Sequence, residues 1–161
     1  YTPLYTLSLH DALPICAMKH VLFVCTGNTC RSPMAEAWLK WYLKSVGKDT
    51  MIHVESCGVY ACDGMTASSG SLARLSKEGI DLSQHRSQSI SRAMIKRADI
   101  IFCMSSIHKK EIVNLIPGAE DKVIVLNVDD PIGFGGDVYD RCFQAIVSGI
   151  REHIDEILKG M

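Results

Sequence analysis

Four short apolar runs, separated by stretches of helical periodicity, constrain the fold of this chain more than any other feature. The runs predict buried strands over residues 20–25, 51–59, 100–104 and 122–128. The spacing of apolar residues predicts helices over 33–46, 69–78, 91–97, 107–115 and 138–158. Most of the runs are continuously apolar, which is typical of parallel strands covered by helices on both faces. The predicted fold is therefore α/β: a single-domain, three-layer α/β/α sandwich around a four-stranded parallel sheet.

The length of the chain and its first residues set the expected domain boundaries. A chain of 161 residues is long enough to bury the core of one domain. Residues 1–17 show mixed polarity, no sustained period, and no basic stretch ahead of a long apolar run. They resemble translated adaptor or vector sequence. We therefore expect a non-native or disordered leader over 1–17 and the domain over 18–161, with a genuine N-terminal arm as the alternative.

Composition and cysteine spacing argue against several kinds of partner. A net charge of −1 gives no electrostatic basis for binding nucleic acid or an anionic membrane surface. No apolar run approaches the ~18 residues that span a bilayer. With no export signal, we expect a cytoplasmic protein whose seven cysteines are free thiols. Cys25 and Cys30 are five residues apart, as are Cys57 and Cys62, which is unlike a zinc knuckle, so we expect no metal and no cofactor.

The turn CTGNTCRS, over residues 25–32, joins the first predicted strand to the first predicted helix. Gly27 and Asn28 tolerate a positive φ, so the backbone can curl and point successive N–H groups inward. The following helix adds the partial positive charge of its N-terminus. Arg31 adds a planar fork that matches two phosphate oxygens. These features predict a cradle for a phosphate group.

Cys25 lies at the base of this predicted cradle. The local positive field lowers the expected pKa of its thiol, and Ser32 can donate a hydrogen bond that lowers it further. A cysteine, an arginine and a phosphate cradle together predict a nucleophile that accepts a phosphoryl group. The alternative is a buried cysteine that merely fills the end of the strand.

The spacing Cys-x5-Arg-Ser at a strand–helix junction is typical of cysteine-dependent phosphatases. In the form VCTGNTCRSPMAE, it closely resembles the low-molecular-weight protein tyrosine phosphatase family. The resemblance extends over 18–161 and includes SCGV (56–59), GIDLSQHRSQSIS (79–91), ADIIFCM (98–104) and the dipeptide Asp130-Pro131. It implies the flavodoxin-like fold of that family and phosphorylated proteins as partners.

The family resemblance implies a two-step mechanism. Cys25 attacks phosphorus while the loop amides and Arg31 hold the equatorial oxygens. Asp130 protonates the leaving group and then acts as the base toward a water molecule. Two alternatives remain at this position: Asp129 as the acid, and Asp130 as a simple cap of the turn before Pro131.

The resemblance also implies that Asn28, Ser56 and His85 brace the loop through hydrogen bonds. The expected residues for phosphate binding and loop support are Thr26, Gly27, Asn28, Thr29, Cys30, Ser32, Ser56 and His85. Two of them have open alternatives. Cys30 is either a small packing residue or a resolving thiol that traps oxidised Cys25 as a disulfide. His85 is either a brace or an ordinary histidine.

Thr29 bears on the substrate. The tyrosine-specific branch of the family carries a bulky aliphatic residue at this position, whereas threonine resembles the protein arginine phosphatases. A small polar side chain favours a slim guanidinium over a flat ring, and Asp130 can pair with guanidinium N–H groups. The segment after Asp130 departs from the expected Asp-Pro-Phe-Gly-Gly, with Ile132 in place of Phe and two extra residues. We expect phosphoarginine, with phosphotyrosine as the alternative.

Two other functions are weaker alternatives. Arsenate reductases of this fold need two further redox cysteines beside the third strand, but Cys103 lies within the predicted strand and SSIHKKEI follows without another cysteine. A non-catalytic phosphate-binding module would be expected to lack Cys25 or Arg31, and both are present. The sequence carries no signal for an oligomeric state.

Overall fold

The computed structural model describes residues 18–161, and the expected leader over 1–17 lies outside the described residues. Four parallel strands form one sheet in the order β2-β1-β3-β4. They are β1 (Lys19–Cys25), β2 (Ile52–Gly58), β3 (Ile100–Cys103) and β4 (Val123–Val125). The chain crosses to one side of β1 to form β2 and to the other side to form β3. This change of direction creates a topological switch point at the carboxyl end of β1.

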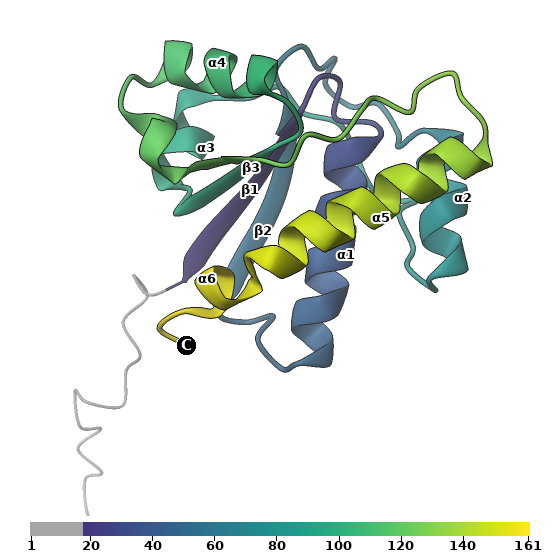
Figure 1. Ribbon diagram of the computed structural model, residues 1–161, viewed down its shortest axis with the longest axis horizontal. Coiled ribbons are helices and arrows are strands. Elements are labelled where there is room, and N and C mark those ends of the chain that lie inside the picture. Colours follow the sequence, from purple (N-terminus) through teal and green to yellow (C-terminus); the bar gives the residue numbers. More distant parts are fainter. Residues whose placement is uncertain (1–17) are drawn as a thin grey trace, which may run out of the picture.

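Helices cover both faces of the sheet, which confirms the predicted three-layer α/β/α fold (Figure 1). One face carries α1 (Arg31–Ser45), α2 (Ser69–Lys77), α5 (Gly136–Glu152) and α6 (Ile154–Leu158). The other face carries α3 (Arg92–Arg97) and α4 (Ser106–Leu115), followed by a short 3₁₀ helix, η2 (Ala119–Lys122). Among residues 18–161, no helix combines the length and the apolar character needed to cross a membrane.

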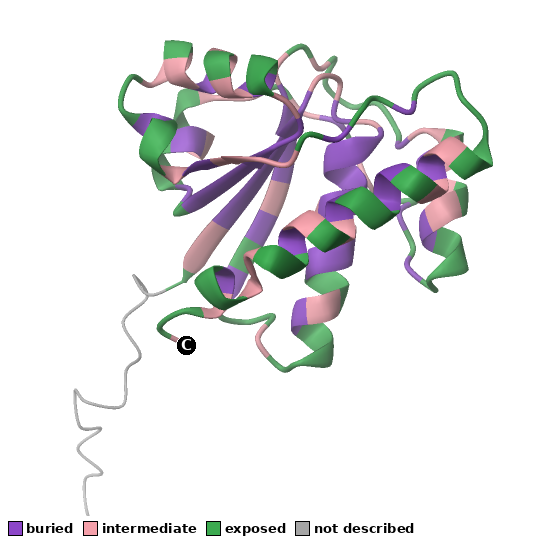
Figure 2. Ribbon diagram, viewed as in Figure 1, coloured by how far each residue is buried: buried purple, intermediate pink, exposed green. Residues whose placement is uncertain are grey.

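The central strand β1 separates two hydrophobic cores (Figure 2). Successive side chains of a strand point to opposite faces, so Phe23 enters the core under α1 and α5 while Leu22 and Val24 enter the core under α3 and α4. Phe23 stacks on Phe102 of β3, with ring centroids 5.3 Å apart. Because both faces of β1 are buried, its sequence is continuously apolar instead of alternating.

The last predicted strand is shorter than the sequence pattern suggests. The prediction covered 122–128, whereas β4 spans only Val123–Val125. At its end, Asn127 adopts a left-handed conformation with φ of 55°, which breaks the extended backbone. At its start, Lys122 belongs to η2, and its ammonium donates to the carbonyl groups of Ile95 and Ala98.

The predicted helix over 138–158 is two helices. Helix α5 ends at Glu152 and α6 begins at Ile154, and the intervening His153 has φ and ψ of −112° and 12°. The His153 ring contacts the Gly149 carbonyl oxygen at 3.0 Å through Nδ1, which helps to satisfy the end of α5. The apolar stripe continues across the break because Ile157 joins the same core, so periodicity alone did not reveal the break.

Candidate active site

The parallel register brings the carboxyl ends of the strands to one edge of the sheet. Cys25, the last residue of β1, is opposite Gly58 of β2, and Val24 is opposite Cys103 of β3. The loop after β4 reaches the same edge, because Val128 N donates to Met104 O at 2.8 Å. The residues that follow β1 and β4 therefore lie at the same edge of the sheet, as expected from the sequence.

A tight loop joins β1 to α1. Asn28, which is fully buried, has a φ of 55°, and its N–H donates to Cys25 Sγ at 3.3 Å. Gly27 can also adopt a positive φ, but its φ lies outside the left-handed region. The curl of the loop therefore depends on Asn28, one of the residue types that tolerates a left-handed conformation.

The Cys25 thiol is almost completely buried, with 2% of the residue exposed. The Ser32 hydroxyl lies 2.9 Å from Sγ. Burial raises the pKa of the Cys25 thiol, and this effect exceeds the lowering by Ser32, Arg31 and the Asn28 N–H. The expectation of a lowered pKa is thus wrong for the described structure, because desolvation of the thiolate is the larger effect. The three polar groups still act to stabilise the thiolate.

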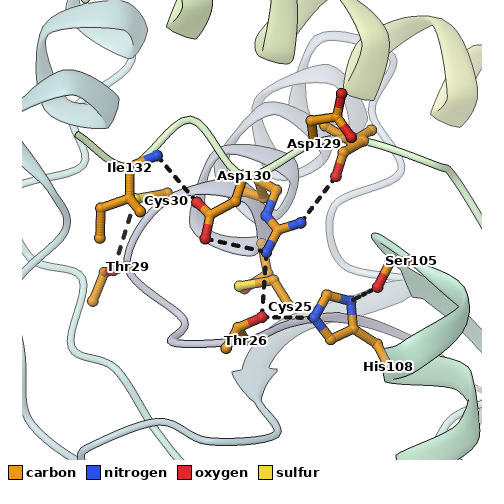
Figure 3. A network of polar contacts seen from close by, with 12 residues as sticks. Cys25, Thr26, Thr29, Cys30, Ser105, His108, Asp129, Asp130 and Ile132 are labelled. Carbon is orange, nitrogen blue, oxygen red and sulfur yellow. Dashed lines mark hydrogen bonds and ion pairs between the residues drawn. The ribbon is translucent and has the colours of Figure 1, made fainter. Parts of the chain in front are cut away.

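The Arg31 guanidinium is buried between three partners. Nη1 donates to Val128 O at 2.9 Å, and Nη2 donates to Thr26 Oγ1 at 3.3 Å. Asp130 Oδ2 lies 3.7 Å from Nη2 (Figure 3). These contacts connect the loop after β1 to the loop after β4, and they place Arg31 beside Cys25.

Asp130 has contacts that fit both interpretations of the Asp-Pro dipeptide. Oδ1 accepts a hydrogen bond from Ile132 N at 3.1 Å, as in a turn cap, while Oδ2 faces Arg31. The Asp130 side chain is 45% exposed and can therefore meet a substrate. In Figure 3, the Asp129 carboxylate points away from the Cys25 sulfur. Of the two acids, Asp130 is the one whose carboxylate contacts Arg31, and its role as the proton donor stays a prediction.

Asn28 is the centre of a network that braces the loop. Its Nδ2 donates to Ser32 Oγ and to Ser56 Oγ, both at 2.9 Å. Its Oδ1 accepts from Gln88 N at 2.9 Å, and its carbonyl oxygen lies 2.7 Å from His85 Nε2. The structure therefore places Ser56 and His85 in contact with Asn28, and their role in supporting the loop stays a prediction.

Thr29 and Cys30 lie on the side of the loop that faces the start of α2 and α5. Thr29 is half-buried, with Oγ1 3.8 Å from Cys30 Sγ. The Cys30 sulfur contacts the hydroxyl groups of Ser68 at 3.3 Å and Tyr139 at 3.5 Å. These contacts fit a packing role for Cys30, and its role as a resolving thiol stays a prediction. The cysteines within 18–161 are free thiols.

Four further residues at the site were missed by sequence reasoning: Glu36, Gly58, Gln88 and His108. Glu36 accepts a hydrogen bond from Ser56 Oγ, and its position one turn after Ser32 in α1 is a helical spacing that could have revealed it. Gly58 lies under the loop, where a Cβ would be 2.4 Å from Thr26 O. His108 Nε2 lies 2.8 Å from Thr26 Oγ1. Gly58 and Gln88 lie within the segments SCGV and GIDLSQHRSQSIS, where no role was assigned to them, and no local motif marks His108.

The chemistry available at this edge is nucleophilic attack on a tetrahedral anion. Cys25 supplies the sulfur, α1 presents its positive N-terminal end, Arg31 supplies a forked cation, and Asp130 supplies a carboxyl group. Within residues 18–161, no cluster of three or more His, Cys, Asp or Glu side chains is placed to hold a metal ion. The fold and the site together define the class of cysteine-dependent phosphatases.

Comparison with known proteins gives the family. Residues 20–160 match the model of the low molecular weight phosphotyrosine protein phosphatases. The chain is 38% identical over 129 residues to a protein-arginine-phosphatase of Geobacillus stearothermophilus, which covers 74% of this chain and 82% of that relative. It is 36% identical over 120 residues to the probable low molecular weight protein-tyrosine-phosphatase EpsP of Ralstonia solanacearum, covering 71% and 79%. The chain therefore belongs to this family and is a phosphatase.

A solved structure gives the same result for the fold. The low molecular weight protein tyrosine phosphatase from T. tengcongensis superposes with a TM-score of 0.80 at 38% sequence identity. The superposition covers 86% of this chain and 99% of that one. The predicted fold of the low-molecular-weight phosphatases is thus confirmed.

Proposed function

We propose that this phosphatase removes phosphate from phosphoarginine residues of proteins. The observation that carries the proposal is Thr29, a small polar residue at the position where the tyrosine-specific branch carries a bulky aliphatic one. A threonine leaves room for a guanidinium and removes the apolar wall that would favour a phenol ring. The exposed carboxyl group of Asp130 can accept from a guanidinium N–H through one oxygen while its other oxygen carries the proton for the leaving nitrogen. The G. stearothermophilus relative, a protein-arginine-phosphatase, supports this choice.

The proposed reaction has two steps. In the first, the Cys25 sulfur forms a bond to phosphorus, the P–N bond of phosphoarginine breaks, and Asp130 gives a proton to the departing nitrogen. In the second, water attacks phosphorus, the S–P bond breaks, and Asp130 accepts the proton from water. Arg31 and the loop amides, including Asn28 N, hold the oxygens whose charge changes.

A protein-tyrosine phosphatase is the second candidate. Two large apolar side chains at the same sheet edge are exposed: Tyr60 after β2 at 66%, and Phe134 after β4 at 64%. Their rings are available to flank a phenol ring. The relative EpsP, a probable protein-tyrosine-phosphatase, supports this alternative.

The test compares two peptides of one sequence, one with phosphoarginine and one with phosphotyrosine. We expect a higher kcat/KM for the phosphoarginine peptide. Thr29→Ile should lower that value about tenfold or more and raise the relative rate on phosphotyrosine, because the longer side chain fills the guanidinium space. Thr50→Ile, at the exposed turn before β2, is the matched control. A tyrosine preference that Thr29→Ile leaves unchanged would refute the phosphoarginine proposal.

The phosphatase chemistry itself needs a separate control. Turnover of para-nitrophenyl phosphate should persist in EDTA and disappear in Cys25→Ser. Activity that EDTA abolishes and Cys25→Ser retains would contradict the role of Cys25 as the nucleophile.

A further inference from the structure

His108 is a buried histidine whose two ring nitrogens both contact hydroxyl groups. It lies in the first turn of α4, with 2% of the residue exposed. Nε2 lies 2.8 Å from Thr26 Oγ1, and Nδ1 lies 3.1 Å from Ser105 Oγ (Figure 3). A buried imidazole with both nitrogens paired is held in a single orientation. The proposed reaction described above makes no use of this ring.

The hydrogen-bonding capacity of Thr26 gives these contacts a direction. A guanidinium can only donate, so Arg31 Nη2 donates to Thr26 Oγ1. Among the described residues, the contact that remains for the Thr26 hydroxyl proton is His108 Nε2, and we therefore assign Nε2 as the unprotonated, accepting nitrogen. The other ring nitrogen, Nδ1, carries the imidazole proton and donates it to Ser105 Oγ. The result is a directed chain from Arg31 through Thr26 and His108 to Ser105.

Ser105 gives a second and independent observation. It is the N-cap residue of α4, yet its side chain makes no capping hydrogen bond. The N-cap serines of α2 and α3, Ser68 and Ser91, each accept a hydrogen bond from the N–H three residues later. The Ser105 hydroxyl contacts His108 instead. Helix α4 therefore forgoes a cap interaction that normally stabilises a helix, and the hydroxyl orients the imidazole.

The charged groups that act on His108 are Arg31 of α1 and Asp130 of the loop after β4. Burial and the Arg31 charge lower the pKa of His108 to about 4, and Asp130 acts in the opposite direction. The ring is consequently neutral near pH 7. A neutral ring keeps one nitrogen as an acceptor, which the direction of the chain requires.

We propose that His108 is a positioning residue for Arg31, acting through the Thr26 hydroxyl. His108 accepts a hydrogen bond from the Thr26 hydroxyl. This hydrogen bond turns the lone pairs of Oγ1 toward Arg31 Nη2 and fixes that end of the guanidinium. Without an acceptor at Nε2, the hydroxyl rotates freely and presents its proton to the cation in part of its orientations. Arg31 is then less well placed for a phosphate group. The inference rests on the proposed role of Arg31 in phosphate binding.

Three substitutions of His108 separate this role from packing. In His108→Gln, the amide oxygen can occupy the place of Nε2. In His108→Asn, the shorter side chain reaches only the place of Nδ1. In His108→Phe, the ring fills the space but offers no hydrogen-bond acceptor. We expect His108→Asn and His108→Phe to raise the Kd for inorganic phosphate about tenfold, the size of one lost charge-assisted contact. We expect His108→Gln to stay within about threefold of the original chain.

Calorimetric titration with inorganic phosphate is the primary measurement, because it needs no turnover. It therefore distinguishes a failure of this inference from a failure of the proposed substrate. The second measurement is kcat/KM for para-nitrophenyl phosphate, which should fall in parallel with phosphate affinity. His153→Gln is the matched control, since this partly buried histidine contacts Phe102 and Gly149 on the far side of β3. It should leave both quantities unchanged.

A double-mutant cycle with Thr26→Val tests the route through Thr26. If His108 acts through that hydroxyl, then His108→Asn should have little further effect on phosphate affinity once Thr26 is replaced. Should the His108 variants fail to fold, Ser105→Ala, which removes the partner of Nδ1, gives the same test in a milder form. Wild-type phosphate affinity in His108→Asn and His108→Phe, or strictly additive effects in the cycle, would overturn the proposal.

Discussion

Two opposing influences act on the sulfur of Cys25. Burial raises the pKa of the thiol, while the Ser32 hydroxyl, the Arg31 charge and the Asn28 N–H lower it. The lowering groups all belong to the loop and to the first turn of α1. Reactivity at this position therefore depends on a few polar contacts that offset the desolvation of the thiolate.

Ser32 makes the shortest of these contacts, which gives a prediction about pH. Its hydroxyl accepts from Asn28 Nδ2, and its own proton has two acceptors, the Cys25 sulfur at 2.9 Å and Cys57 O at 3.4 Å, of which the sulfur is the nearer. Ser32→Ala removes that donor and should raise the pKa of Cys25. The acidic limb of the kcat/KM profile should move to higher pH, and the rate at pH 6 should fall about tenfold or more.

The measurement for Ser32→Ala is the pH dependence of Cys25 alkylation, together with the kcat/KM profile. Ser45→Ala, at the opposite end of α1, removes a hydroxyl that donates only to Tyr42 O and serves as the control. An alkylation profile that is identical in Ser32→Ala and the original chain would show that this hydroxyl does not stabilise the thiolate.

At the scale of elements, the loop after β1 lies directly against the end of β2. Gly58, the last residue of β2, pairs with Cys25, and its N–H and carbonyl bond to the backbone of Gln88 and Ile90. A Cβ at Gly58 would lie 2.4 Å from Thr26 O and 2.9 Å from Asn28 N. These are backbone atoms of the phosphate loop, which cannot rotate away as a flexible side chain can. Position 58 therefore requires glycine because the backbone of the phosphate loop lies too close for a Cβ, and not because of a positive φ.

Gly58→Ala should consequently affect both stability and activity. We expect a loss of about 1–3 kcal/mol in the free energy of unfolding, as is usual for overpacking, and a fall in kcat/KM because the loop must shift. The control is Gly136→Ala in the first turn of α5, where a Cβ would meet nothing within 4 Å. Denaturant unfolding and kcat/KM measured on both variants test this, and wild-type values for Gly58→Ala would contradict it.

At the scale of the whole molecule, features encoded within a short segment were predictable from the sequence. The strand–loop–helix unit around Cys25 and Arg31 depends on neighbours in the chain, so the pattern CTGNTCRS located it. The contacts of Gly58 and His108 depend on the register of three parallel strands, which no segment encodes. The raised pKa of Cys25 depends on burial by the complete fold and was missed for the same reason. The break at His153 was missed because both helices share one apolar stripe.

Burial of His108 also links the site to the stability of the whole molecule. Its pKa is about 4 in the folded chain and about 6.5 when the histidine is unfolded and hydrated. Between these values the unfolded chain binds more protons, so stability falls as the pH drops from 6.5 toward 4. The part of the unfolding free energy that depends on the neutral His108 ring is fully present above pH 6.5. About 3 kcal/mol of it should be lost by pH 4.

His108→Gln tests this linkage because glutamine cannot take up the proton. Chemical denaturation at pH 7 and at pH 4.5 should show a smaller loss of unfolding free energy in His108→Gln than in the original chain. His153→Gln controls for the removal of a histidine from elsewhere in the fold and should keep the larger loss. An equal acid dependence in the original chain and in His108→Gln would mean that the imidazole remains accessible to protons. In that case part of the His108 rings would be charged near pH 7, and the chain from Arg31 to Ser105 would hold only in the neutral fraction.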